Sequence, residues 1–183
     1  MSEVDLDVPS GSVVGLIGPN GAGKTTCFNA IGGYVKPYAG EVSVNGARMH
    51  KSNPRAAWKA GIGRTFQRLE LFWTLTVTDH IELARRLALK QRRTPPATTD
   101  IVSILGLGGL EDRTVATLSL GTNRLVELAR AIATGSSLIL MDEPCSGLDH
   151  RETDTLKSAL AQMREELSLS LLIVEHDMDF ILS

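Results

Sequence analysis

The chain has 183 residues, 43% of them hydrophobic, with a net charge of −2 and an isoelectric point of about 6.1. This length predicts one domain with a sizeable core, and the charge balance argues against a nucleic-acid partner. The sequence has no apolar run near the ~20 residues that a membrane helix needs, and its acidic N-terminus lacks a signal-peptide pattern. We therefore expect a cytosolic domain that reaches a membrane only through a partner.

The first elements along the chain predict a strand–loop–helix unit. Residues 4–8 alternate apolar and acidic side chains, which is the pattern of a half-buried strand. The apolar run at residues 13–17 predicts a second strand, and residues 27–31 predict a helix that ends at a Gly-Gly pair. Between them, residues 18–25 fit the pattern G-x-x-x-x-G-K-T. A strand before this pattern and a helix after it indicate a phosphate-binding P-loop rather than an ordinary glycine-rich turn.

The P-loop pattern predicts how a nucleotide is held. Its glycines bring main-chain N–H groups close to phosphate oxygens, and the helix N-terminus adds partial positive charge. The Lys24 side chain is expected to reach the β- and γ-phosphates, and the Thr25 hydroxyl to ligate Mg²⁺. The expected nucleotide-binding residues are Gly18, Pro19, Asn20, Gly21, Ala22, Gly23, Lys24, Thr25 and Thr26.

The next segment predicts a hairpin, a short helix and a strand. Residues 41–46 predict a strand that runs into an Asn-Gly turn. Asn53 as a cap and Pro54 at the first helical position predict a short helix. A strand is expected at residues 62–66, and Gln67 lies at its end.

The middle of the chain is predicted to be helical. Thr76 and Asp79 form a capping-box pattern that opens a helix. The apolar face of that helix is expected to comprise Ile81, Ala84, Leu87 and Ala88. A second helix is expected at residues 101–105, and the basic cluster at residues 90–93 is interpreted as a solvated helix end. No strand pattern occurs between residues 68 and 117.

The remaining elements predict a return to alternating helices and strands. Apolar residues at helical spacing over 125–133 predict a helix, and residues 138–141 predict a buried strand. A long amphipathic helix follows, with Leu156, Ala159, Leu160, Met163 and Leu167 on one face. Residues 171–174 predict the last strand. This alternation implies a largely parallel sheet covered on both faces.

The predicted fold class is therefore α/β. We expect a P-loop NTPase (RecA-like) core with a mainly parallel sheet, a small antiparallel β portion and an inserted α-helical subdomain. In this interpretation residues 1–67 and 123–183 form the nucleotide-binding core, and residues 68–122 form the helical subdomain.

An acidic pair supplies the expected second half of the nucleotide site. Asp142 and Glu143 directly follow the buried strand that is predicted upstream of them. Asp142 is expected to hold Mg²⁺, and Glu143 to orient and deprotonate an attacking water. An acidic pair at a strand end is weak support by itself, but the upstream P-loop makes it strong.

Further motifs resemble those of ATP-binding cassette (ABC) transporter ATPases. Gln67 falls at the Q-loop position, residues 146–149 at the D-loop, with Asp149 as its acidic residue, and His176 at the switch histidine. The segment that resembles the family's signature is Leu118, Ser119, Leu120, Gly121 and Thr122. The resemblance covers nearly the whole chain. In finer detail, residues 61–67 and 173–178 look like the ATPases that import branched-chain amino acids.

The resemblance implies a head-to-tail dimer with a second ABC ATPase subunit, and ATP and Mg²⁺ as ligands. Ser119 and Gly121 would contact the γ-phosphate bound by the partner, while Glu143 and His176 would act on the attacking water. Gln67 would contact Mg²⁺ and relay its state to the helical subdomain, which would grip a membrane permease. A periplasmic or extracellular solute-binding protein and the cytoplasmic face of the plasma membrane are implied as partner and location.

Several expected site residues have a purely structural alternative. Ser119 and Asp149 could cap the helices that follow them, which is compatible with their implied roles. His176 could be a surface histidine, although the carboxyl end of a parallel strand favours function. Gln67 could be an ordinary amide at a strand end.

The sequence also departs from the family pattern. The family usually has a small or aromatic residue at Leu120, a glutamine at Thr122 and a small or hydroxyl residue at Cys145. Upstream of Gly18 the chain has no aromatic residue to stack on adenine, and it stops seven residues after His176. We therefore expect a member truncated at both ends. A binding-only module and a non-transport ABC ATPase stay open as alternatives, whereas no N-K-x-D guanine motif supports a P-loop GTPase.

Overall fold

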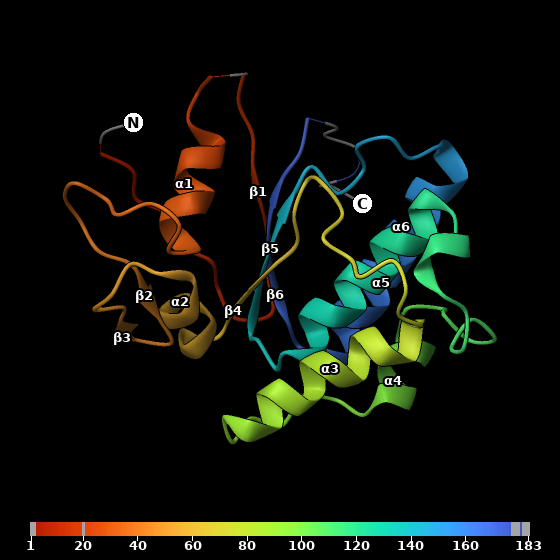
Figure 1. Cartoon of the computed structure of the whole chain (residues 1–183). Coiled ribbons are helices and arrows are strands. Elements are labelled where there is room, and N and C mark those ends of the chain that lie inside the picture. Colours follow the sequence, from red (N-terminus) through yellow and green to blue (C-terminus); the bar gives the residue numbers. More distant parts are fainter. Residues whose placement is uncertain (1–2, 20, 177–179, 181–183) are drawn as a thin grey trace.

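The computed structural model describes residues 3–19, 21–176 and 180 and shows an α/β protein (Figure 1). Among the described residues, the main sheet has four parallel strands in the order β1-β6-β5-β4, and a two-stranded antiparallel sheet pairs β2 with β3. The strands are β1 (Val13–Leu16), β2 (Ser43–Val44), β3 (Ala47–Arg48), β4 (Ile62–Arg64), β5 (Leu138–Asp142) and β6 (Ser170–Val174). The helices are α1 (Lys24–Ile31), α2 (Pro54–Ala60), α3 (Val77–Lys90), α4 (Thr98–Ile104), the 3₁₀ turn η1 (Val115–Thr117), α5 (Leu120–Ala133) and α6 (His150–Leu167). The α/β class with a parallel sheet and a small antiparallel part is confirmed.

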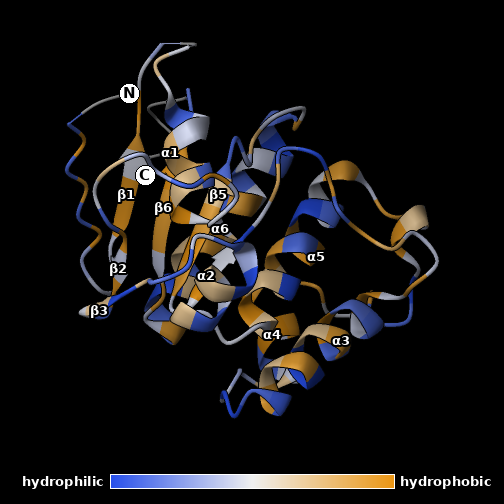
Figure 2. Cartoon of the chain, turned by 60° about the vertical axis from the view of Figure 1, so that its left-hand side comes forward, coloured by the Kyte–Doolittle hydropathy of each residue, from blue (hydrophilic) through white to orange (hydrophobic). Residues whose placement is uncertain are grey.

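The central strands separate two apolar cores, because successive side chains of a strand point to opposite faces. Leu140 and Leu172 pack with Phe28 of α1 on one face. Ile139 and Leu171 pack with α5 and α6 on the other face. Helices therefore cover both faces of the sheet (Figure 1), and β1, β5 and β6 are largely hydrophobic along their length (Figure 2).

The segment between β4 and α5 is helical, as predicted, with α3 and α4 packed beside α5 (Figure 1). The capping box at the start of α3 is present, since the Thr76 side chain accepts from Asp79 N and the Asp79 side chain accepts from Thr76 N. Of the predicted apolar face, Ile81, Ala84 and Ala88 are buried, but Leu87 is 51% exposed and does not join the core. The neighbouring helices cover a narrower stripe of α3 than the apolar residues span.

The predicted hairpin is present but short. Asn45 and Gly46 both have positive φ angles, 51° and 74°, which is the backbone that an Asn-Gly turn favours. The predicted strand at residues 4–8 is wrong, because the described part of this segment forms no strand ladder. Its apolar side chains are largely uncovered, with Val4 50% and Leu6 38% exposed. Alternation alone cannot make a strand without a neighbour to receive its hydrogen bonds.

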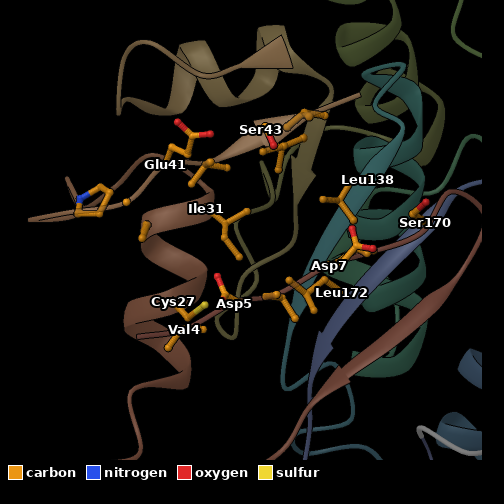
Figure 3. Close-up of a pocket in the computed structure, with 18 of the residues that line it drawn as sticks. Val4, Asp5, Asp7, Cys27, Ile31, Glu41, Ser43, Leu138, Ser170 and Leu172 are labelled. Carbon is orange, nitrogen blue, oxygen red and sulfur yellow. The ribbon is translucent and has the colours of Figure 1, made fainter. Parts of the chain in front are cut away.

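Residues 3–10 instead line a cavity of about 1000 Å³ together with α1 and the β2–β3 hairpin (Figure 3). Its apolar side chains include Ile31, Leu138 and Leu172, and acidic side chains such as Asp5 and Glu41 also line it. Leu138 begins β5, so this cavity lies toward the amino ends of the strands.

The basic cluster after α3 is not wholly solvated. The Arg93 guanidinium donates to the carbonyl oxygens of Trp58, Thr134 and Gly135 and stacks over the Trp58 ring. Burial lowers the pKa of Arg93. This side chain therefore joins the ends of α2 and α5, which the local sequence could not indicate. Among the described helices, none is long and apolar enough to span a bilayer.

Candidate functional site

The expected site residues converge because the main strands are parallel, so their carboxyl ends meet at one edge of the sheet (upper edge in Figure 1). The P-loop follows β1, and Gln67 lies three residues beyond the end of β4. Glu143 follows β5, and His176 lies two residues beyond β6. Four segments that are distant in sequence thus reach one edge.

The P-loop has the geometry of an anion cradle. Gly21 and Gly23 have φ angles of 82° and 93°, a region that L side chains rarely adopt, and Gly23 caps α1. The first turn of α1 has neither a side-chain cap nor an acidic residue, so its N–H groups and dipole are available to an anion. Asn20 lies outside the described residues.

Lys24 places a positive charge inside this loop. Its side chain is buried, and Nζ donates hydrogen bonds to the carbonyl oxygens of Gly18 and, at 3.0 Å, Pro19. The ammonium is therefore held against the loop backbone rather than extended into solvent. Thr25 and Thr26 are exposed in the first turn of α1.

Glu143 is contacted from both sides by the two other expected catalytic residues. Gln67 Nε2 donates to Glu143 Oε2 at 2.7 Å, and His176 Nε2 lies 3.1 Å from Glu143 Oε1. The Glu143 backbone has a positive φ of 48°, and its N–H donates to the Val174 carbonyl at 2.8 Å. The carboxylate is thus oriented at the sheet edge, where it can accept a proton from a water molecule.

Asp142 ends β5 in a largely buried position, 8% exposed. Desolvation raises the pKa of this carboxyl, the Arg64 charge opposes that effect, and Glu143 adds to it. Arg64 Nη2 lies 3.4 Å from Asp142 Oδ2, and Arg64 Nη1 donates to Asn29 Oδ1 of α1 at 2.7 Å. Arg64 was not predicted as a site residue, although a charged residue in the strand expected at residues 62–66 was a usable signal.

The rings of Phe28, Tyr34 and Phe66 surround the Arg64 guanidinium, with centroids 5.9, 5.0 and 5.1 Å from Cζ. Such cation–π contacts keep a charge favourable where water is excluded. They hold the Arg64 side chain between α1 and the end of β5.

Thr25 and Asp142 supply a hydroxyl and a carboxylate, the oxygen donors that Mg²⁺ prefers. The described residues contain no group of three or more His, Cys, Asp or Glu side chains that could hold a metal alone. Mg²⁺ usually keeps several waters and binds through one or two protein ligands plus substrate phosphates. The donor set therefore fits an ion that arrives with a nucleotide.

The signature segment forms the start of α5. Ser119 caps this helix, and its Oγ accepts from Thr122 N at 3.2 Å. Asp149 caps α6 in a capping box with Glu152, so the structural roles considered for Ser119 and Asp149 are both present. Leu120 is 38% exposed, and its side chain lies near the D-loop backbone at Gly147.

Sequence reasoning also missed a buried ion pair that holds the Q-loop backbone. The Arg124 guanidinium donates to the carbonyl oxygens of Phe66 (2.8 Å) and Gln67 (2.6 Å) and lies 3.3 Å from Glu127 Oε2. Glu127 Oε1 accepts from Phe66 N at 3.1 Å. The helix predicted at residues 125–133 did not include Arg124, because α5 begins earlier, at Leu120, so the pairing with Glu127 was not predicted.

Comparisons with known proteins agree with this geometry. A family model described as "ABC transporter" matches residues 1–146. The branched-chain amino acid transport ATP-binding protein BraF of Pseudomonas aeruginosa is 31% identical over 98% of this chain and 77% of its own length. The sulfate/thiosulfate import ATP-binding protein CysA of a Synechocystis strain is 34% identical over 98% of this chain and 50% of its own.

Solved structures show the same architecture. The ATP-binding cassette MJ1267 in its ADP conformation has a TM-score of 0.83, with 29% identity over 98% of this chain and 76% of that one. The bacterial cassette MJ0796, solved as a dimer, has a TM-score of 0.77, with 25% identity over 97% of this chain and 80% of that one. Since the family match covers most of the sequence, the chain belongs to the ABC transporter family, whose ATP-binding cassettes are ATPases.

Proposed function

We propose that this chain is the ATP-hydrolysing subunit of an importer that carries a small solute, in particular branched-chain or other amino acids. The observation that carries the proposal is Glu143, held between Gln67 and His176 at the sheet edge where the P-loop opens. Each of these residues comes from a different strand end, so the cluster exists only in the folded chain. It supplies a base, an amide and an imidazole beside a phosphate cradle.

The chemistry that follows is attack of water on the γ-phosphorus of ATP. Glu143 accepts the water's proton, the new P–O bond forms, and the bond from γ-phosphorus to the β–γ bridging oxygen breaks to release ADP. Lys24 and the N–H groups of α1 bind the phosphates, and His176 stabilises the γ-phosphate and the water. Bound Mg²⁺ neutralises phosphate charge, and Thr25, Gln67 and Asp142 would hold it.

We further propose that two chains act together, each signature facing the partner's P-loop, so that Ser119, Leu120, Gly121 and Thr122 lie at the partner's ATP. The D-loop residue Asp149 belongs to the same interface in this proposal. The dimeric solved cassette supports it. The helical subdomain, residues 68–122, is proposed to bind the permease at the cytoplasmic face of the membrane, with an external solute-binding protein delivering cargo.

A permease contact is supported by two exposed aromatic side chains shortly after Gln67. Phe72 is 56% exposed and Trp73 is 50% exposed. The buried His80 holds this loop, because its Nε2 accepts from Phe72 N at 3.0 Å and its ring lies 6.0 Å from the Phe72 ring. Large apolar groups on a fixed loop are typical of a protein contact.

Separate measurements of ATP binding and turnover test the proposed activity. Glu143→Gln should keep ATP affinity and lower kcat by about 10²–10⁴-fold, the scale of a general base. Lys24→Ala should lose binding as well, because the phosphates lose their cation. Glu165→Gln on the exposed face of α6 is the matched control. An unchanged kcat in Glu143→Gln would remove Glu143 as the base, and binding without turnover in the natural chain would favour the binding-only alternative.

The identity of the solute is the finer part of the proposal. BraF is named for branched-chain amino acid transport and CysA for sulfate/thiosulfate import, yet both are similarly identical to this chain, at 31% and 34%. The resemblance of residues 61–67 to the ATPases that import branched-chain amino acids favours amino acids. Uptake of radiolabelled leucine and sulfate in cells with and without this chain tests it. Loss of leucine uptake with intact sulfate uptake supports the proposal, and the reverse result contradicts it.

A further inference from the structure

A carboxylate of the same chain occupies the donors of the signature segment. Glu152, in the first turn of α6, accepts from Ser119 Oγ at 2.9 Å and from Gly121 N at 3.0 Å, both on Oε1. A serine hydroxyl and a backbone amide each have one hydrogen to donate. Both donors that the proposed function reserves for the partner's ATP are therefore directed at Glu152.

The contact is closely packed. A Cβ on Gly121 would lie 2.7 Å from Glu152 Cγ and 2.8 Å from its Cβ and Cδ, so only glycine allows the Glu152 stem to lie against α5. Beside it, the Leu120 side chain lies close to Gly147 of the D-loop. A Cβ built on Gly147 would lie 3.2 Å from Leu120 Cδ2. The start of α5 and the start of α6 thus contact each other through the signature.

The Glu152 carboxylate is negatively charged, as is the γ-phosphate with which it would compete for these donors. An anion is favoured at the N-terminus of α5, because the first-turn N–H groups and the helix dipole face it. Glu152 meets that preference with one negative charge. The γ-phosphate of ATP carries more charge and more acceptor oxygens, whereas ADP has no group at that position.

Glu152 has a second partner that would receive it after displacement. Its Oε2 lies 3.4 Å from Asp149 N in the capping box of α6, and the side chain is only partly buried. When Glu152 moves away from Ser119 and Gly121, its carboxylate therefore does not become a buried charge without a hydrogen-bond donor.

We propose that Glu152 is a specificity-determining residue of the two-chain reaction. It holds the Ser119 and Gly121 donors within its own chain and releases them only to the γ-phosphate on the partner subunit, which sets the ATP concentration at which two chains close. This inference rests on the proposed function, because it requires the signature to bind the partner's ATP.

The test measures ATP-driven dimerisation by analytical ultracentrifugation in a Glu143→Gln background, which prevents turnover. Adding Glu152→Gln removes the competing charge, so the ATP concentration for half-dimerisation should fall by about fivefold, the scale of one charge at a helix N-terminus. Adding Asp154→Asn, an exposed charge two residues further along α6, should leave it unchanged.

A second variant separates the signature contact from the helix cap. Glu152→Asp keeps a capping box, as Asp79 does at the same position of α3, but shortens the reach to Ser119. It should also lower the ATP concentration for half-dimerisation. An unchanged or higher value in both Glu152 variants overturns the inference while leaving the two-chain site intact. Failure of every variant to dimerise with ATP would overturn both proposals.

Discussion

The buried pair Arg124 and Glu127 should be a highly mutation-sensitive charge contact. Arg124 is 7% exposed and Glu127 is 1% exposed, so neither charge is solvated when its partner is removed. Arg124→Met would remove the ion-pair partner of the buried Glu127 carboxylate and leave only the Arg130 charge acting on it. Breaking a buried pair in this way costs about 3–5 kcal/mol, and we expect a loss of that size in the free energy of unfolding.

The second variant to measure combines Arg124→Met with Glu127→Gln. The glutamine oxygen can still accept from Phe66 N, and the buried charge without its ion-pair partner is gone. The Gln67 carbonyl oxygen loses its Arg124 donor in this variant, but Gln67 is exposed, so water can donate to that oxygen instead. We therefore expect the double variant to lose only about 1–2 kcal/mol, less than the single variant, because an unpaired buried charge costs more than the lost hydrogen bonds.

Urea unfolding followed by circular dichroism and extrapolated to water measures both values. Arg164→Met, an exposed arginine in the last turn of α6, is the control and should stay within about 0.5 kcal/mol of the natural chain. A double variant less stable than Arg124→Met alone would refute the reasoning. So would a loss below about 1 kcal/mol in the single variant, since that would mean the pair is solvated.

Two further predictions concern the backbone and pH. Gly33→Ala should lower the free energy of unfolding in urea by about 3 kcal/mol, because its Cβ would lie 2.5 Å from the Asn53 backbone at a φ of 77°. The control Gly109→Ala has a φ of 80° but open space around the Cβ, and should lower it by only about 1 kcal/mol. Equal losses in the two variants would mean that the Asn53 contact is absent. Desolvation lowers the pKa of the buried His80 below the ordinary histidine value of about 6.5. The unfolded chain therefore takes up the proton first, so stability is present above about pH 6.5 and is lost as pH falls toward the lower folded value. Unfolding free energies near pH 7.5 and near pH 5.5 should differ less in His80→Gln than in the natural chain, and equal differences would contradict this origin.

Local sequence rules predicted most elements of this fold. The Asn53 cap with Pro54, the Thr76–Asp79 capping box and the Asn45–Gly46 turn all form as expected, because each depends on contacts within a few residues. The strand expected at residues 4–8 failed for the opposite reason. A strand is completed by hydrogen bonds to another chain segment, and alternation carries no information about that neighbour.

The P-loop, the acidic pair and the order of the family motifs were determined by the sequence itself, since these patterns specify residue types at fixed spacing. Where the side chains meet was decided by the tertiary structure. The parallel order β1-β6-β5-β4 brings Gln67 and His176 onto Glu143, although 76 and 33 residues separate them from it. Packing of α5 against α6 brings Glu152 onto the signature, 33 residues from Ser119. Such contacts follow from how elements pack, and a local pattern contains no record of that packing.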